Sequence, residues 1–352
     1  MSTMIAAIVR APGDFGITEK EKPAAPPGGL LLKVLACGLC GSDLRTLRSG
    51  HHRVKLPFTI GHETSGEVVE LGDGYKGNFT SGDRLAVSPL VYCGKCEFCH
   101  KGRYEFCIHY REIAQHWEGG FAEYMAIPKD AIKLGTIQAI PPDLDPVHAT
   151  LVEPLSSCVN AQEVGKVLKG DTVVVIGAGS IGTFHVELAR ANGAAKIIVI
   201  DISEDRLHLM QDYSPDALIN ASETDPVSEV RKLTKNYGAE VVITANSVPE
   251  TQVQAVEMAR KGGRILLFGG LPPEKSRPGI DMNLVHYNAL HLIGSTIFAP
   301  RHNLKALQLI ASGVISADKF ISHVFPLEQF EYGARLALEG KARKVVFTTK
   351  AD

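Results

Sequence analysis

The sequence predicts an α/β protein that combines a mostly-β domain with a doubly wound parallel sheet. Residues 1–150 carry short apolar or alternating runs separated by turns rich in Gly and Pro, a pattern typical of a compact β domain. From residue 170 onward, continuous apolar runs alternate with helical patterns. A chain of 352 residues is also too long for one ordinary hydrophobic core, so two domains are expected.

Strands in the first half are predicted where apolar runs lie between turn signals. The turn signals are the sequences APGD, PPGG, GDG and SGD, which supply the residues that tight turns favour. The clearest strand candidates between them are 30–35, 66–70 and 84–87.

The second half predicts six buried strands, because runs such as TVVVI and KIIVI are apolar on both faces, as a parallel sheet requires. The predicted strands are 172–176, 196–200, 217–219, 240–244, 264–268 and 291–293. The predicted helices between them are 180–192, 203–213, 226–237 and 250–260. The C-terminal tail has no place in this sheet and is expected to form helices 303–312 and 327–339 and a last strand, 344–348.

The composition excludes several classes of partner. Lys and Arg number 37 and Asp and Glu number 39, so no excess positive charge favours nucleic acid or an anionic membrane. The first ten residues lack the basic lead and cleavage pattern of a signal peptide, and no apolar run approaches the length that spans a bilayer. We therefore expect a cytoplasmic protein whose cysteines are mostly reduced.

A glycine-rich turn after the first strand of the second half predicts a dinucleotide site. The G-x-G-x-x-G pattern follows TVVVI and opens a helix, which is the context that makes this short motif informative. The glycines allow a tight turn, a close approach to a pyrophosphate and close packing of helix on strand, and the helix N-terminus favours phosphate. The predicted cofactor loop consists of Gly177, Gly179, Ser180, Ile181 and Gly182.

Asp201 ends the next predicted strand, 19 residues after Gly182. An acid at this place hydrogen-bonds the ribose hydroxyls and repels a 2′-phosphate, so NAD is predicted rather than NADP. Arg206 lies five residues further on and is read either as a residue that flanks the adenine or as a solvated helix residue.

Four cysteines in the C-x2-C-x2-C-x7-C spacing predict a structural zinc site. Short loops bring such thiolates together, and zinc bound by four sulfur atoms has no open position for a substrate. The spacing differs from that of bacterial ferredoxins, which closes with three residues and a proline. The predicted ligands are Cys93, Cys96, Cys99 and Cys107.

A second group of donors predicts a catalytic zinc. Cys40, His62 and Glu63 offer a thiolate, an imidazole and a carboxylate, and Glu153 lies further along the chain. A catalytic zinc keeps three protein ligands and one exchangeable position, so a set of this kind suits it.

These motifs resemble those of the zinc-dependent medium-chain dehydrogenases of the alcohol dehydrogenase family, nearest the polyol and sorbitol dehydrogenase branch. The resemblance runs nearly end to end. The motifs that carry it are the glycine loop with Asp201, the four-cysteine lobe, Cys40-Gly-Ser42-Asp43, Gly61-His62-Glu63-x-x-Gly66, Gly82-Asp83-Arg84 and Glu153-Pro154-Leu155.

The resemblance implies a GroES-like catalytic domain (1–152 and 294–352) interrupted by a Rossmann NAD-binding domain (153–293), two Zn²⁺ per chain, and a homodimer or homotetramer. It assigns the catalytic zinc to Cys40, His62 and Glu63, with Glu153 as a further ligand or a carboxylate that exchanges with water. Ser42 would contact the substrate oxygen, and Lys344 would lie near the cofactor phosphates.

Two positions depart from the family pattern. Many alcohol dehydrogenases have a proton-relay histidine five residues after the first zinc ligand, where this chain has Arg45, which cannot shuttle protons. His51 or His52 is one alternative relay, and zinc-bound water with Glu153 is another. Sorbitol dehydrogenases carry an Arg-Tyr pair after a cleft Phe. Here 298–301 reads Phe-Ala-Pro-Arg, and Arg301 is read either as a contact for a polar or anionic substrate or as a solvated helix-start residue.

The function predicted from these features is NAD-dependent hydride transfer from a secondary alcohol of a polyol, sugar or related hydroxy compound. Within this class, L-threonine 3-dehydrogenase and sugar 1-dehydrogenase activities are the alternatives. A catalytically silent protein that binds nucleotide and zinc is the alternative from a different class. The exact substrate is not fixed by the sequence, because pocket walls come from distant segments.

Overall fold

The computed structural model describes residues 2–51, 53–134 and 136–350, and these form two compact units. Unit 1 comprises residues 1–156 and 298–352, and unit 2 comprises residues 157–297. The domain limits expected from the family resemblance fall four residues earlier at each boundary and remain a prediction. Among the described residues, no helix is both long enough and apolar enough to cross a bilayer.

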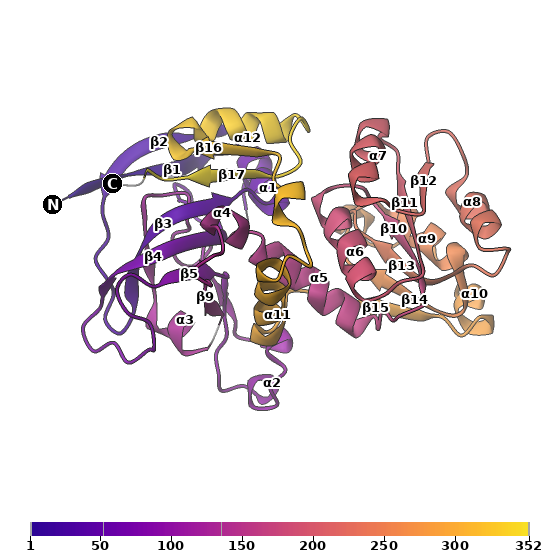
Figure 1. Ribbon diagram of the computed structural model, residues 1–352, viewed down its shortest axis with the longest axis horizontal. Helices are drawn as coiled ribbons and strands as arrows, with labels where there is room; N and C mark the ends of the chain where they lie inside the picture. The colour runs from indigo at the N-terminus through magenta and orange to yellow at the C-terminus, as the bar shows by residue number, and fades with distance from the viewer. Residues whose placement is uncertain (1, 52, 135, 351–352) are drawn as a thin grey trace. The chain divides into compact units, whose positions relative to one another are not determined.

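Unit 1 is built around a seven-stranded sheet to which both its N-terminal and its C-terminal segments contribute strands. Its strand order is β16-β17-β3-β4-β5-β9, and β8 also pairs with β3. These strands are β3 (Leu30–Gly38), β4 (Glu63–Leu71), β5 (Arg84–Val87), β8 (Tyr124–Ile127), β9 (Ile137–Ala139), β16 (His323–Pro326) and β17 (Val345–Thr348). In Figure 1 the yellow C-terminal strands lie beside the purple β3 and β4. The tail that had no place in the parallel sheet thus completes this one.

Two smaller pairs of strands and several helices surround this sheet. β1 (Thr3–Ala11) pairs with β2 (Asp14–Glu21), and β6 (Leu90–Val91) pairs with β7 (Arg111–Glu112). The helices of unit 1 are α1 (Gly41–Ser49), α2 (Glu97–His100), α3 (Lys129–Lys133), α4 (Pro146–Ala149), α11 (Pro300–Ala311) and α12 (Phe330–Leu338). The unit boundary falls within α5 (Val152–Val164).

The register of the central strands places the end of β3 between two other segments. Gly38 pairs with Glu63 at the start of β4 and with Val346 of β17, both antiparallel. Three segments that are far apart in the sequence therefore meet at one end of the sheet. The core beneath them includes Phe121, Phe330 and Phe347, whose ring centroids lie 4.9–5.7 Å apart.

Unit 2 is a doubly wound, all-parallel sheet of six strands in the order β12-β11-β10-β13-β14-β15. The strands are β10 (Thr172–Ile176), β11 (Lys196–Asp201), β12 (Ala217–Asn220), β13 (Ala239–Thr244), β14 (Ala259–Leu267) and β15 (His291–Gly294). Its helices are α6 (Ser180–Ala191), α7 (Glu204–Met210), α8 (Pro226–Leu233), α9 (Pro249–Met258) and α10 (Met282–Tyr287). Figure 1 shows α6 and α7 on one side of the sheet and α8, α9 and α10 on the other.

The predicted strands and helices of unit 2 are confirmed, with differences at several ends. α7 ends at Met210 rather than 213 and is followed by a 3₁₀ helix, Gln211–Tyr213, and β14 begins at Ala259 rather than 264. α8 ends at Leu233 rather than 237 because Lys235 and Asn236 adopt positive φ angles, which a right-handed helix does not accommodate. α9 ends at Met258 rather than 260 because Ala259 already pairs with Ala239 as part of β14.

Candidate metal and cofactor sites

The four cysteines of the segment 93–107 lie together. Each offers a sulfur atom, and these four atoms all lie within 4.8 Å of one another. The Cys93 Sγ atom is 3.5 Å from Cys107 Sγ and 3.9 Å from Cys99 Sγ. A closed set of four thiols fits tetrahedral zinc without an open position, so the donors match the structural role predicted for them.

The four thiols differ in pKa because their surroundings differ. A hydrogen bond from the backbone N–H of Cys99 lowers the pKa of Cys96 to about 6. Burial raises the pKa of Cys99 to about 12. Because zinc binds thiolates, loading this site must release protons, and its affinity for zinc falls as the pH falls.

The four-cysteine segment is tied to the start of α11. Glu105 is buried and lies 2.8 Å from Arg103 Nε and 3.4 Å from Arg301 Nη2. The hydroxyl of Tyr92 donates a hydrogen bond to the carbonyl of Phe298. Neither interpretation of Arg301 from the sequence includes its contact with Glu105, which joins the arginine to the four-cysteine segment.

The second predicted donor set also assembles. Cys40, His62 and Glu63 each place a ligand atom within 4.8 Å of the others. Cys40 is the residue just before α1, and its backbone N–H donates to the Asp43 carboxylate at 3.0 Å. Thiol, imidazole and carboxylate donors from two separate segments therefore converge, and their chemistry fits a zinc ion.

His62 is oriented by an acid. Its Nδ1 atom lies 3.3 Å from the buried carboxylate of Asp43, and its Nε2 atom lies 3.4 Å from Ser42 Oγ. Burial lowers the pKa of His62, but the charges of Asp43 and Cys40 outweigh this, and the net pKa is well above the usual value. An Nδ1–H bonded to a carboxylate leaves Nε2 as the metal-binding atom, and metal binding would displace the second proton.

Glu63 is held by a buried lysine. Lys344 Nζ donates to Glu63 Oε2 and, at 3.2 Å, to the carbonyl of Leu39. Burial lowers the pKa of Lys344, but Glu63 raises it further, so the ammonium form persists. The other oxygen, Oε1, is buried without a hydrogen-bond partner among the described residues, as expected for an atom that awaits a cation. A Cβ at Gly38 would lie 2.2 Å from Glu63 Oε2, so only glycine fits there.

Glu153 lies in the first turn of α5. Packing around its carboxyl raises its pKa to about 7, and His62 and Glu63 are among the charges that act on it. The charges of the second donor set therefore influence Glu153, but Glu153 is not one of the three residues whose ligand atoms lie within 4.8 Å of one another. Its role as a zinc ligand remains a prediction.

The glycine loop has the geometry that its motif predicts. Gly177 follows β10 with a φ of +119°, and a Cβ there would lie 2.9 Å from the Ala245 carbonyl oxygen. A Cβ at Gly182 would lie 1.7 Å from the Gly177 carbonyl oxygen. Beside Gly179, the residue before α6, a Cβ would meet no atom within 4 Å. The loop is thus tight inside and open beside Gly179, where a pyrophosphate has room to approach, with Ser180 and Ile181 opening α6.

Asp201 braces this loop. Its Oδ2 atom accepts a hydrogen bond of 2.7 Å from the backbone of Ala178, and Oδ1 accepts one of 3.0 Å from Ser203. Arg206 Nη1 lies 3.8 Å from the same carboxylate. The predicted contacts of Asp201 with ribose and of Arg206 with adenine remain predictions.

Sequence reasoning missed two partners of the second donor set. Asp43 was part of a quoted motif, but its bond to His62 Nδ1 was not foreseen. Lys344 was assigned to the cofactor phosphates, whereas its observed partners are Glu63 and Leu39, and the cofactor contact stays a prediction. The sequence contained a signal for the role of Asp43, since an acid three residues after Cys40, at the start of a helix, faces back toward it.

Two histidines were proposed as alternative proton relays. His51 accepts a hydrogen bond from the Arg53 backbone, and His52 lies outside the described residues.

A parallel-sheet unit with a glycine loop, joined in one chain to a thiol, imidazole and carboxylate set, defines a zinc- and nicotinamide-dependent oxidoreductase. Comparisons with known proteins agree. Residues 26–136 match the alcohol dehydrogenase GroES-like domain, and residues 180–312 match the zinc-binding dehydrogenase domain.

Similar proteins cover nearly the whole chain. An L-threonine 3-dehydrogenase of Pyrococcus furiosus is 32% identical over 99% of this chain and 100% of its own length. A sorbitol dehydrogenase of Halalkalibacterium halodurans is 31% identical over 96% of each. The structure of a zinc-binding dehydrogenase from Sinorhizobium meliloti, bound to NADP, has a TM-score of 0.89 and 31% identity over 99% of this chain and 100% of the other. The chain belongs to the zinc-dependent medium-chain alcohol dehydrogenase family.

Proposed function

We propose that the chain oxidises a secondary alcohol of a polyol, sugar or related hydroxy compound with NAD at the site formed by Cys40, His62 and Glu63. The observation that carries this proposal is the convergence of these three donors, with His62 oriented by Asp43 and with one Glu63 oxygen unpartnered. Zinc bound there would act as a Lewis acid that lowers the pKa of the substrate hydroxyl.

The surrounding side chains have distinct tasks in this proposal. Lys344 donates to Glu63 and fixes its carboxylate in place. Ser42 is exposed and next to His62 Nε2, so its hydroxyl is placed to hold and pass on the proton that the substrate loses. Glu153 has a pKa raised to about 7 and so exchanges protons near neutral pH. In this proposal it is the second group, after Ser42, to carry the proton. Arg45 needs no role in the route.

L-threonine 3-dehydrogenase activity is the second candidate. It is favoured by a specific observation, the 32% identity to such an enzyme over nearly the full length of both chains. A panel of polyols, sugars and L-threonine, followed through NADH absorbance, distinguishes the two. Turnover of L-threonine alone would replace the polyol proposal.

The metal assignment is tested by Cys40→Ser. We expect about two zinc ions per chain in the native protein and about one in this variant, because the four-cysteine site is intact. Turnover should fall about a thousandfold, equivalent to about 4 kcal/mol of transition-state stabilisation, while the circular dichroism spectrum is retained. Unchanged turnover would refute the catalytic assignment, and one zinc per native chain without turnover would favour the silent alternative.

The cofactor preference is tested by Asp201→Asn. The carboxylate repels a 2′-phosphate, so the native enzyme should have a higher kcat/KM with NAD than with NADP. Removing the charge should lower the ratio of kcat/KM with NAD to kcat/KM with NADP by about tenfold, equivalent to about 1.4 kcal/mol. A native preference for NADP would overturn the proposed role of Asp201.

Assembly and location complete the proposal. We expect a homodimer or homotetramer in the cytoplasm. Light scattering on the purified zinc-loaded protein measures the first, and a monomer would contradict it.

A further inference from the structure

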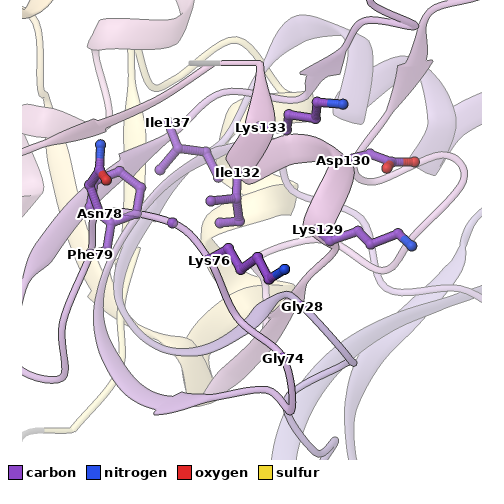
Figure 2. Close-up of a pocket in the computed structure, with 11 residues that line it drawn as sticks. Gly28, Gly74, Lys76, Asn78, Phe79, Lys129, Asp130, Ile132, Lys133 and Ile137 are labelled. Carbon is purple, nitrogen blue, oxygen red and sulfur yellow. The ribbon is translucent and has the colours of Figure 1, made fainter.

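Unit 1 contains a concave site that the proposed reaction does not use. It is a cavity of about 980 Å³ between the loop that follows β4 and the helix α3. Small-molecule sites commonly have volumes of about 300–1,000 Å³. Figure 2 shows Lys76 on the loop, Lys129 and Lys133 on α3, and Ile132 and Ile137 beside them.

The loop wall of the cavity lies away from the second donor set. β4 begins at Glu63, a proposed zinc ligand, and ends at Leu71, just before the cavity loop. Eight steps along a strand at about 3.3 Å each put roughly 26 Å between these residues. The antiparallel partner β3 begins near Gly28, which also lines the cavity, and ends near Glu63. The cavity loop and Gly28 thus lie at the far end of this pair of strands from Glu63. Ile137, on another wall of the cavity, lies two strands across from Thr64 through Val87.

The cavity wall is a built structure. The backbone N–H of Gly28 donates to the Asp73 carbonyl at 2.8 Å, and the N–H of Phe79 donates to the Tyr75 hydroxyl at 3.0 Å. A Cβ on Gly77 would lie 2.7 Å from Ile132 Cγ2, so the loop backbone packs directly against α3. These contacts hold the two walls in place before any ligand arrives.

The electrostatics of the cavity favour an anion. Lys76, Lys129 and Lys133 are exposed, and no carboxylate of the described residues lies within 4 Å of their ammonium groups. Asp130 is the one carboxylate among the described lining residues, and Arg111 pairs with it at 2.5 Å. Lys129 and Lys133 are also four residues apart on one helix, an unfavourable arrangement for like charges that an anion would relieve.

The floor of the cavity is apolar. Phe79, Ile132 and Ile137 line it, and Phe79 and Ile132 also pack on the hydrophobic core of unit 1. A ligand that fills this space therefore needs a carbon body with an apolar face as well as charge. We propose that the cavity binds a small organic phosphate, with the phosphate on the three lysines and the carbon body on Phe79, Ile132 and Ile137. A phosphate monoester carries about two negative charges and is a common partner of lysine, so it matches three ammonium groups better than a single carboxylate does.

The test uses 1-naphthyl phosphate as the probe. Its affinity is measured by isothermal titration calorimetry at fixed low ionic strength, with the full zinc-loaded protein and saturating NAD, so that the dinucleotide site is filled. 1-Naphthol is the comparison compound without the phosphate. We expect the phosphate to bind more tightly than the naphthol.

The decisive variant is Lys76→Gln/Lys129→Gln/Lys133→Gln. Glutamine keeps the helix propensity of lysine, and exposed ion pairs are worth about 0.5 kcal/mol each, so the affinity should fall roughly tenfold. The matched control, Lys261→Gln/Lys275→Gln/Lys305→Gln, removes the same charge elsewhere and should bind like the native protein. The single variant Lys129→Gln gives a smaller loss if the triple variant is unstable by circular dichroism.

Two results would overturn the proposal. Equal losses in the two triple variants would mean that the probe responds only to net charge. Naphthol binding as tightly as its phosphate would mean that the lysines recognise no anion. Turnover without the probe should be the same in native protein and both variants, and a loss confined to the cavity variant would show that the cavity belongs to the reaction site.

Discussion

Two sites in this molecule, one in each unit, bury ionisable groups in opposite ways. Around the second donor set, unit 1 buries charged groups next to opposite charges: Lys344 contacts Glu63, and His62 contacts Asp43. In unit 2, His185 is fully buried on α6 with no charged partner, and burial alone lowers its pKa to about 3. Burial disfavours a charge unless a partner compensates it. The raised pKa values of Lys344 and His62 in unit 1 therefore favour their charged forms, and the lone histidine of unit 2 stays neutral.

The largest test of this comparison is Lys344→Met, which breaks the most deeply buried pair. Methionine keeps the packing but leaves Glu63 with an uncompensated buried charge, which typically costs about 3–5 kcal/mol of unfolding free energy. The loss is measured by urea unfolding of the zinc-free protein. Zinc should recover part of it, since a cation next to Glu63 replaces the lost ammonium.

The matched control for this test is Lys341→Met. Lys341 contacts Glu339 at 2.7 Å, but both side chains are exposed, so water compensates the remaining charge. An equal loss in the two variants would mean that burial does not distinguish the pairs, and the comparison between the units would fail.

A different contrast, between contiguous motifs and long-range pairs, explains what the sequence could predict. The glycine loop spans Gly177 to Gly182 and the four-cysteine segment spans residues 93–107, so each is one contiguous stretch whose spacing carries its chemistry. The six strands of unit 2 were equally readable, because strands buried on both faces are continuously apolar. A site or strand can be predicted from the sequence where one contiguous stretch of backbone forms it.

Charge pairing across the sheet could not be read in this way. Lys344 and Glu63 are 281 positions apart, and they meet only because β17 and β4 both lie next to β3, at Gly38. No periodicity encodes such a register. The early end of α9 has a similar cause, since Ala259 extends to pair with Ala239 of another strand.

A second, smaller effect is expected from Asp43→Asn. Outer carboxylates that orient a metal-binding histidine typically contribute about 10- to 100-fold to metal affinity or activity. We expect zinc at the second set to be weakened within this range in chelator competition, with the four-cysteine zinc unaffected. Asp83→Asn is the control, because Asp83 caps a turn at Thr80 and is not paired with His62. If both variants keep native zinc affinity, Asp43 does not orient the ligand.

The buried histidine of unit 2 gives the last test, a dependence of stability on pH. The side-chain amide nitrogen of Gln162 donates to the His185 carbonyl at 2.8 Å and lies 3.3 Å from His185 Nδ1. The ring packs edge-on against Phe268 with centroids 4.7 Å apart, and its Nε2 atom has no hydrogen-bond partner among the described residues. Protonation of His185 in the folded state therefore finds no acceptor.

The sign of the effect follows from proton binding. The pKa of His185 is about 3 in the folded chain against an ordinary 6.5, so between these values the unfolded chain binds more protons. The contribution of His185 to stability is complete above pH 6.5 and is lost as the pH falls, by about 1.4 kcal/mol per unit, or about 2 kcal/mol at pH 5. Urea unfolding at several pH values should show a shallower acid decline in His185→Leu than in the native chain or in His208→Gln, which changes an exposed histidine. If the slope of His185→Leu equals that of the native chain, unit 2 does not hold this histidine neutral, and lone burial in unit 2 no longer differs from paired burial in unit 1.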